Sequence, residues 1–152
     1  MKILKIIMFF VIVYLLSVFT GYFSTIDYQE TVSSSCLECS LLRDVFILPV
    51  FSSIVLTFLF FVLKKILKKR MLTSAIILVL FIVFGLLNNY YIFADRISAW
   101  SSFSLESEII GVVDDSYVYL LISAVILFVI LMRLNIFNSN PVLLQETTQF
   151  HE

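Results

Sequence analysis

Four long stretches without a charged residue constrain the fold of this 152-residue chain more than any other feature. They cover residues 6–26, 45–63, 71–94 and 116–132. A helix of about 17–25 apolar residues crosses the hydrocarbon core of a bilayer, and each stretch has that length. Apolar side chains would cover every side of each helix, whereas helices of a soluble bundle carry a polar face. The sequence therefore predicts an all-α integral membrane four-helix bundle, with residues 1–152 forming a single transmembrane domain.

Composition agrees, because 61% of the residues are hydrophobic and 14% are charged, against about half and a quarter in soluble domains. The basic start MKILK followed by an apolar run is also typical of a signal peptide. A cleavage site of small residues does not follow that run, since FTGYFST is a poor substitute. We therefore expect residues 6–26 to be a retained helix.

Charged residues separate into two groups that alternate between the spans. The N-terminus, the link between the second and third spans and the C-terminal tail carry Glu146 and Glu152 against Lys2, Lys5, Lys64, Lys65, Lys68, Lys69, Arg70 and Arg133. The two remaining loops carry Arg43 and Arg96 against Asp27, Glu30, Glu38, Asp44, Asp95, Glu106, Glu108, Asp114 and Asp115. Basic residues are retained in the cytoplasm, so we expect both termini inside, both acidic loops outside, and a bacterial inner (plasma) membrane location. The polar tail, residues 135–152, is expected to be a flexible cytoplasmic segment.

The inventory of catalytic groups is nearly empty. The one histidine, His151, lies at the end of the tail, and the three glycines form no phosphate-binding loop, so we expect no metal site. The basic KKILKKR segment is interpreted as a topological anchor at lipid headgroups rather than a nucleic-acid site. No charged residue is expected to be buried in a span, which argues against a transporter. Serines and threonines of the spans are expected to pack between helices, while Asn88 and Asn89 are expected to be solvated.

Both cysteines lie in the segment SSSCLECSLLRD, in the first outer loop immediately before the second span. In an oxidising compartment, Cys36 and Cys39 would tend to form a disulfide. A position before a helix N-terminus also stabilises thiolates, and Arg43 adds a favourable positive charge. Glu38 and Asp44 oppose that effect. The residues leave two interpretations open, a structural staple and a redox pair.

The four spans together with the CxxCxxxR pattern of Cys36, Cys39 and Arg43 resemble the bacterial disulfide bond formation protein B family and, more distantly, the vitamin K epoxide reductases. Pro49 is similar to a residue of some members. The resemblance implies that the cysteine pair passes electrons to a membrane quinone bound near Arg43. The family carries another cysteine pair in its second outer loop, whereas residues 95–115 of this chain contain none. Because thiol–disulfide relay needs a thiol at each end, the complete relay cannot run within this chain.

Two functions from different classes follow. The first is a non-catalytic membrane protein that recognises another membrane or periplasmic protein, as an immunity or exclusion protein or an accessory subunit does. The alternative is a thiol–disulfide oxidoreductase that uses Cys36, Cys39 and a quinone. The sequence favours the first, because the second cysteine pair is missing, and it does not decide whether the chain is an enzyme. The lipid bilayer is a partner in either case, nucleic acid in neither, and a cofactor is implied only by the alternative.

Overall fold

The structure is a computed structural model, and it describes residues 2–67 and 69–133. Its long helices are α1 (Lys2–Thr25), α2 (Leu41–Ile66), α3 (Arg70–Arg96) and α4 (Leu105–Arg133). Two short 3₁₀ helices, η1 (Ile26–Tyr28) and η2 (Ser98–Trp100), follow α1 and α3. The expected flexible tail, residues 135–152, lies outside the described residues. All four long helices are long and apolar enough to cross a membrane, which confirms the predicted all-α class and the four candidate spans.

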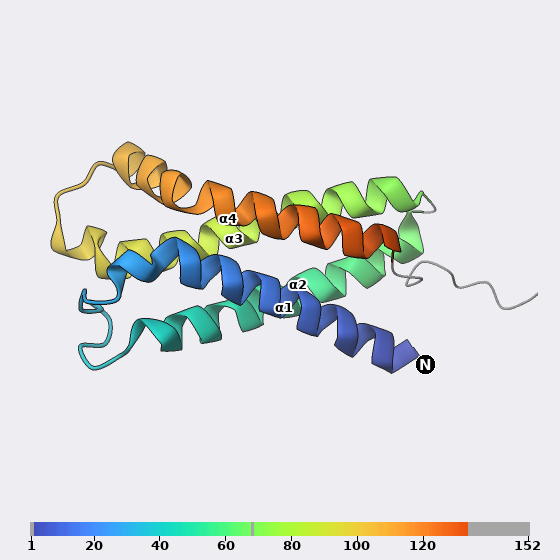
Figure 1. Ribbon diagram of the computed structural model, residues 1–152, viewed down its shortest axis with the longest axis horizontal. Coiled ribbons are helices and arrows are strands. Elements are labelled where there is room, and N and C mark those ends of the chain that lie inside the picture. The colour runs from blue at the N-terminus through green and yellow to red at the C-terminus, as the bar shows by residue number, and fades with distance from the viewer. Residues whose placement is uncertain (1, 68, 134–152) are drawn as a thin grey trace, which may run out of the picture.

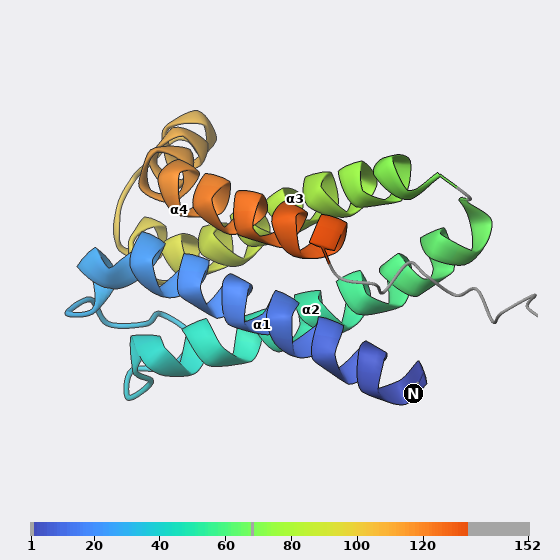
Figure 2. The same cartoon turned by 45° about the vertical axis from the view of Figure 1, so that its right-hand side comes forward.

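The helices run up and down in one bundle (Figures 1 and 2). The segments that connect α1 to α2 and α3 to α4 meet at one end of the bundle, which we call the loop end. The start of α1, the link between α2 and α3 and the end of α4 gather at the other end, which we call the terminal end. Among the described residues, the two charge groups of the sequence therefore belong to opposite ends of the bundle. Arg43 and Arg96 are the basic residues at the acidic loop end.

The core near the middle and the terminal end consists of large apolar side chains from all four helices. Phe9 of α1 stacks on Phe60 of α2 with ring centroids 4.2 Å apart. The same buried cluster contains Ile77 and Phe81 of α3 and Leu127 of α4. Lipid tails are as apolar as these side chains, so close packing rather than the hydrophobic effect holds the helices together. Gly85 allows such an approach between α3 and α4, because a Cβ at that position would lie 2.5 Å from Cδ2 of Leu120.

Polar side chains join the helices at three positions toward the loop end. Thr20 Oγ1 and Ser123 Oγ lie 2.8 Å apart, which confirms that such residues pack between helices. Asn88 Nδ2 donates to Ser52 Oγ at 3.0 Å, and Asn89 Nδ2 donates to Ser116 Oγ at 2.8 Å. The expectation that the asparagines are solvated is wrong for Asn89, which is 2% exposed, while Asn88 is half-buried. An amide in an apolar span is costly unless paired, and these serines provide the partners.

The fourth helix is longer than the uncharged run that predicted it. It begins at Leu105 rather than at residue 116, so Glu106, Glu108, Asp114 and Asp115 are helical rather than parts of a loop. Two of these carboxylates lie in the first turn, where they complement the helix dipole. Ser104 Oγ accepts a hydrogen bond from the Ser107 amide at 3.3 Å, as an N-cap does. The charged residues mark the start of the apolar run at residue 116, but the helix extends through them to Leu105.

Candidate functional site

The predicted cysteine pair lies at the loop end, directly before α2. Cys36 and Cys39 are joined by a disulfide, with their Cα atoms 5.3 Å apart. The Cys39 amide donates to the Cys36 carbonyl at 3.0 Å, which closes a tight turn around the two intervening residues. Ser40 is the N-cap residue of α2, and its extended backbone leads from the turn into the helix. Both cysteines are half-buried, so the sulfur atoms lie at the surface of a helix N-terminus.

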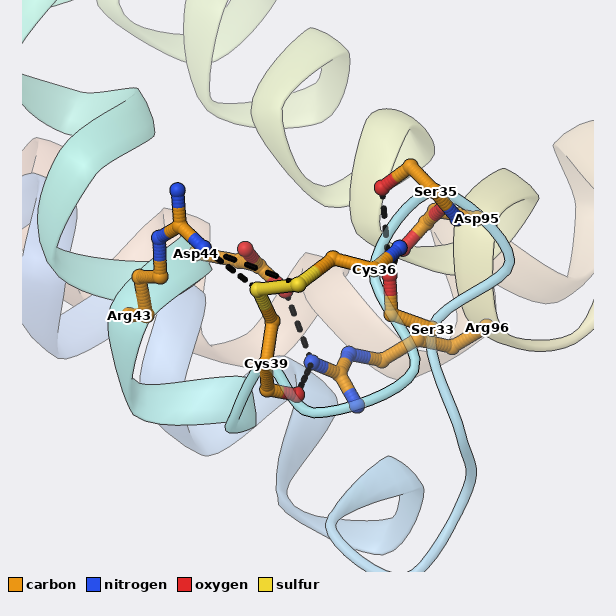
Figure 3. The surroundings of a disulfide bond; sticks show 8 residues. All are labelled: Ser33, Ser35, Cys36, Cys39, Arg43, Asp44, Asp95 and Arg96. Atoms are coloured by element: carbon orange, nitrogen blue, oxygen red, sulfur yellow. Dashed lines mark hydrogen bonds and ion pairs between the residues drawn. A yellow bond between two sulfur atoms is a disulfide. The ribbon is translucent and has the colours of Figure 1, made fainter.

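Arg43 lies in the first turn of α2 with its guanidinium against the disulfide, as the spacing predicted. Its Nη1 donates to Cys39 Sγ and lies 3.7 Å from Cys36 Sγ (Figure 3). Asp44 was expected to oppose this positive charge, but its carboxylate accepts a hydrogen bond from Arg96. The sulfur atoms therefore face one cation whose charge is not matched by the neighbouring aspartate.

Arg96 is the functional-site residue that the sequence reasoning missed. Its Nη1 donates to the Thr31 carbonyl at 2.7 Å, and its Nη2 donates to the Cys39 carbonyl at 3.1 Å and to Asp44 Oδ2 at 2.7 Å. Figure 3 shows this guanidinium beside the backbone of Cys39. Arg96 was counted as one of the loop charges, yet it is the last residue of α3 and is 2% exposed.

The four uncharged runs contain no charged residue, as expected, but α3 and α4 extend beyond these runs and bury Arg96 and Glu108 at the loop end. Arg96 is buried because the polar loop over it supplies two carbonyl acceptors and α2 supplies the Asp44 carboxylate, and these three acceptors offset the cost of removing the charge from water. Glu108 of α4 is also buried and accepts hydrogen bonds from Tyr90 at 3.0 Å and from Ser98. The adjacent charges Asp95–Arg96, directly after the uncharged run of the third span, were the available signal.

Asp95 fixes the other side of the cysteine loop to α3. Its Oδ1 accepts hydrogen bonds from Ser34 Oγ at 2.8 Å and from the Ser35 amide at 2.9 Å. Its backbone carbonyl accepts from the Ser34 amide at 3.0 Å. Trp100 of η2 adds a further link, because its Nε1 donates to the Val32 carbonyl at 2.9 Å. The loop is thus held mostly by bonds to its backbone, with the Ser34 hydroxyl as a side-chain contribution.

Two cavities lie at or near the loop end. One, of about 360 Å³, is beside the disulfide, and its walls include Cys39 and Arg96 but not Arg43. The other is an apolar groove of about 450 Å³ between α3 and α4, lined by residues such as Leu87 and Ile109. Within residues 2–67 and 69–133, no three His, Cys, Asp or Glu side chains are grouped so as to hold a metal ion.

Comparison of the chain with protein-family models, with curated proteins and with solved structures finds no match.

Proposed function

We propose that this protein recognises another membrane or periplasmic protein through its loop end, in the manner of an immunity or exclusion protein or an accessory subunit. The observation that carries the proposal is the clamp formed by Arg96, which fixes the disulfide-closed loop to α2 and α3. A surface that is already ordered before binding loses less conformational entropy when its partner arrives. Loops fixed in this way are suited to recognition.

Exposed apolar side chains on that ordered surface support the proposal. Leu37 is 72% exposed between the cysteines, Trp100 is 61% exposed and Phe103 is 47% exposed. The indole of Trp100 is oriented by its bond to the Val32 carbonyl. Large aromatic side chains held in place provide most of the binding free energy at protein interfaces. These three residues are the expected anchors.

The orientation of the bundle is part of the proposal. We place the loop end in the periplasm and the terminal end in the cytoplasm of a bacterial cell, because Lys64, Lys65 and Lys69 belong to the terminal end and basic residues are retained inside. A reporter enzyme fused after Glu152 tests this directly. A reporter that functions only in the cytoplasm should be active, and activity of a periplasm-specific reporter at that position overturns the orientation.

Site-specific photo-crosslinking in cells tests the recognition function. A photoreactive phenylalanine analogue at Trp100 or Phe103 should give a discrete adduct with one partner protein, and the same analogue at Met71 should not. Met71 is a matched control, since it is 59% exposed but lies at the terminal end. The adduct should also form after Cys36→Ser and Cys39→Ser substitution if the disulfide acts as a staple. Absence of any loop-end adduct in cells that contain the protein contradicts the proposal.

The position of Arg43 favours a second candidate, the thiol–disulfide oxidoreductase. A thiolate of a partner dithiol would attack Cys36 Sγ, with Cys39 leaving as a thiolate beside the Arg43 guanidinium. The partner's second thiol would resolve the mixed disulfide, so the partner is oxidised and the Cys36–Cys39 pair is reduced. The two electrons and two protons would pass to a membrane quinone, which becomes the quinol, as the family resemblance implies.

Reoxidation of the reduced protein tests this candidate. Protein reduced with dithiothreitol and then freed of it should convert decylubiquinone to its quinol in a Cys36-dependent reaction, measured by the loss of quinone absorbance. The Cys36→Ser variant is the control for direct reaction of residual reductant. If the reduced wild-type protein leaves the quinone unchanged, the oxidoreductase candidate is ruled out. The disulfide is then a structural staple of the loop.

A further inference from the structure

We infer that the cavity beside the disulfide binds a lysine or arginine side chain from an extended segment of the partner polypeptide. This inference rests on the proposed recognition function and names the chemistry of its ligand. The cavity encloses about 360 Å³, which is within the size range of sites for small molecules or side chains. The following residues line it: Tyr22, Gln29, Glu30, Thr31, Val32, Leu37, Glu38, Cys39, Ser40, Leu41, Leu42 and Arg96.

The charge of the cavity favours a cationic group. Glu30 and Glu38 line it from two different parts of the loop, and both side chains are exposed. Arg96 is its one basic residue, and the positive charge of Arg96 is matched by Asp44, 2.7 Å away. The two glutamates therefore leave the cavity with an excess of negative charge. Charge complementarity of this kind selects partners and speeds their association.

Arg96 contributes no free hydrogen-bond donor to the cavity. Its Nε has no hydrogen-bond partner among the described residues, but this atom is fully buried, so a ligand in the cavity does not reach it. Both Nη atoms are bonded to acceptors of the protein. The charged groups that a ligand meets are therefore the two glutamates, which favour a cation.

Apolar side chains on the cavity wall fit the remainder of the ligand. Leu37, Leu41 and Leu42 line the space together with Val32. Lysine and arginine place their methylene stems along apolar surface and keep the charged head near polar groups. The stem would pack on these side chains while the head reaches Glu30 or Glu38. The combination of leucines and carboxylates favours a basic peptide over a purely apolar one.

The protein carries its own reporter for this site. Trp100 is the one tryptophan of the chain, and its indole is bonded to the carbonyl of Val32, which lines the cavity. The purified full-length protein in lipid nanodiscs is titrated with acetyl-Gly-Arg-Gly-amide while Trp100 fluorescence is recorded. A saturable change at millimolar peptide is expected. The neutral peptide acetyl-Gly-Gln-Gly-amide should bind at least about tenfold more weakly, a difference of about 1.4 kcal/mol.

Paired variants assign the effect to the cavity. Glu30→Gln with Glu38→Gln should weaken binding of the arginine peptide about tenfold. Glu106→Gln with Asp114→Asn removes the same charge from α4 at the same end of the bundle, outside the cavity lining, and should leave binding unchanged. Equal losses in both pairs, equal binding of the neutral peptide, or no saturable change with the arginine peptide overturns the inference.

These outcomes are separate from those of the recognition function. Photo-crosslinking uses Trp100 and Phe103, neither of which lines the cavity. Loop-end adducts without peptide binding would overturn the cavity assignment and leave the recognition function supported. Peptide binding without any loop-end adduct in cells would support the cavity assignment and contradict the recognition function.

Discussion

The guanidinium of Arg96 and the carboxylate of Asp44 form an ion pair of 2.7 Å that joins the last residue of α3 to the first turn of α2. The Arg96 side chain is 1% exposed, while that of Asp44 is 27% exposed. Because the same guanidinium holds the Thr31 and Cys39 carbonyls, this pair connects the cysteine loop to two helices at once. The loop end is therefore one cooperative unit rather than two independent loops.

Replacing Asp44 by Asn should strongly destabilise the fold, since it leaves the buried Arg96 without its counter-charge. Breaking a fully buried pair costs about 3–5 kcal/mol, and we expect about 2 kcal/mol because Asp44 is partly exposed. Denaturant unfolding in detergent, followed by Trp100 fluorescence, measures this. Asp114→Asn is the control and should change stability by less than about 0.5 kcal/mol. Equal stability of the two variants would show that the pair does not hold the loop end.

Replacing Arg96 by Lys should loosen the cysteine loop although the charge is retained. One ammonium group cannot reproduce the planar array that reaches Thr31, Cys39 and Asp44. We expect dithiothreitol to reduce the Cys36–Cys39 disulfide several-fold faster, measured by the rate of maleimide labelling. Arg133→Lys, at the far end of α4, should leave the rate unchanged. A slower rate in Arg96→Lys would contradict the clamp.

Arg43 should have the opposite influence on the same reaction. Its guanidinium stabilises the thiolate that leaves when the disulfide is attacked. Arg43→Gln should therefore slow reduction by dithiothreitol about tenfold at neutral pH, while Arg43→Lys should retain part of the rate. An unchanged rate in Arg43→Gln would mean that the contact with sulfur has no chemical consequence, and it would weaken the oxidoreductase candidate.

The buried bond between Asn89 and Ser116 should stabilise the contact between α3 and α4. Hydrogen bonds between membrane helices contribute about 0.6 kcal/mol on average and at most about 1.7 kcal/mol. A double-mutant cycle with Asn89→Ala and Ser116→Ala should give a coupling free energy near the upper part of that range, because the bond is buried and 2.8 Å long. The part-buried Asn88–Ser52 pair is the comparison and should give a smaller value. A coupling free energy near zero for Asn89 would contradict this account.

Gly85 should tolerate a methyl group poorly. A Cβ there would meet Leu120 Cδ2 at 2.5 Å, and Leu120 is buried, so Gly85→Ala should cost about 1–3 kcal/mol through overpacking. Leu120→Ala should cost less in the Gly85→Ala chain than in the wild-type chain, because it removes the clash. Gly111 is the matched control, because its nearest foreign atoms would lie at an ordinary 3.7 Å. Greater loss in Gly111→Ala than in Gly85→Ala would show that the helices adjust freely.

Much of the fold was predictable because hydrophobicity and length are local properties. The four uncharged runs identified the helices α1 to α4. The charged segments that flank these runs indicated which segments share an end of the bundle. The boundaries were less predictable, most of all for α4, where Glu106 and Glu108 continue the helix beyond the apolar core. Apolar runs mark the part of a helix that needs lipid, while backbone hydrogen bonding continues for as long as the capping residues allow.

The candidate site was predictable only where its parts are close in sequence. Cys36, Cys39 and Arg43 lie within eight residues of the chain, so their spacing alone predicted that the cation lies near the sulfur atoms. Arg96 is far from them in the chain, and its position beside Asp95 after an uncharged run was the one local signal, which does not identify its partners. The pairing of Asn89 with Ser116 was missed for the same reason, because each side chain finds its partner on another helix.

The sequence by itself determined that the four helices are suited to a bilayer, since a bilayer accepts long apolar helices and excludes charge. It also determined that the cysteine pair precedes a helix. Only the tertiary structure decided which charges are buried, since burial depends on the acceptors that distant segments bring together. Arg96 could leave water because the Thr31 and Cys39 carbonyls and the Asp44 carboxylate converge on it.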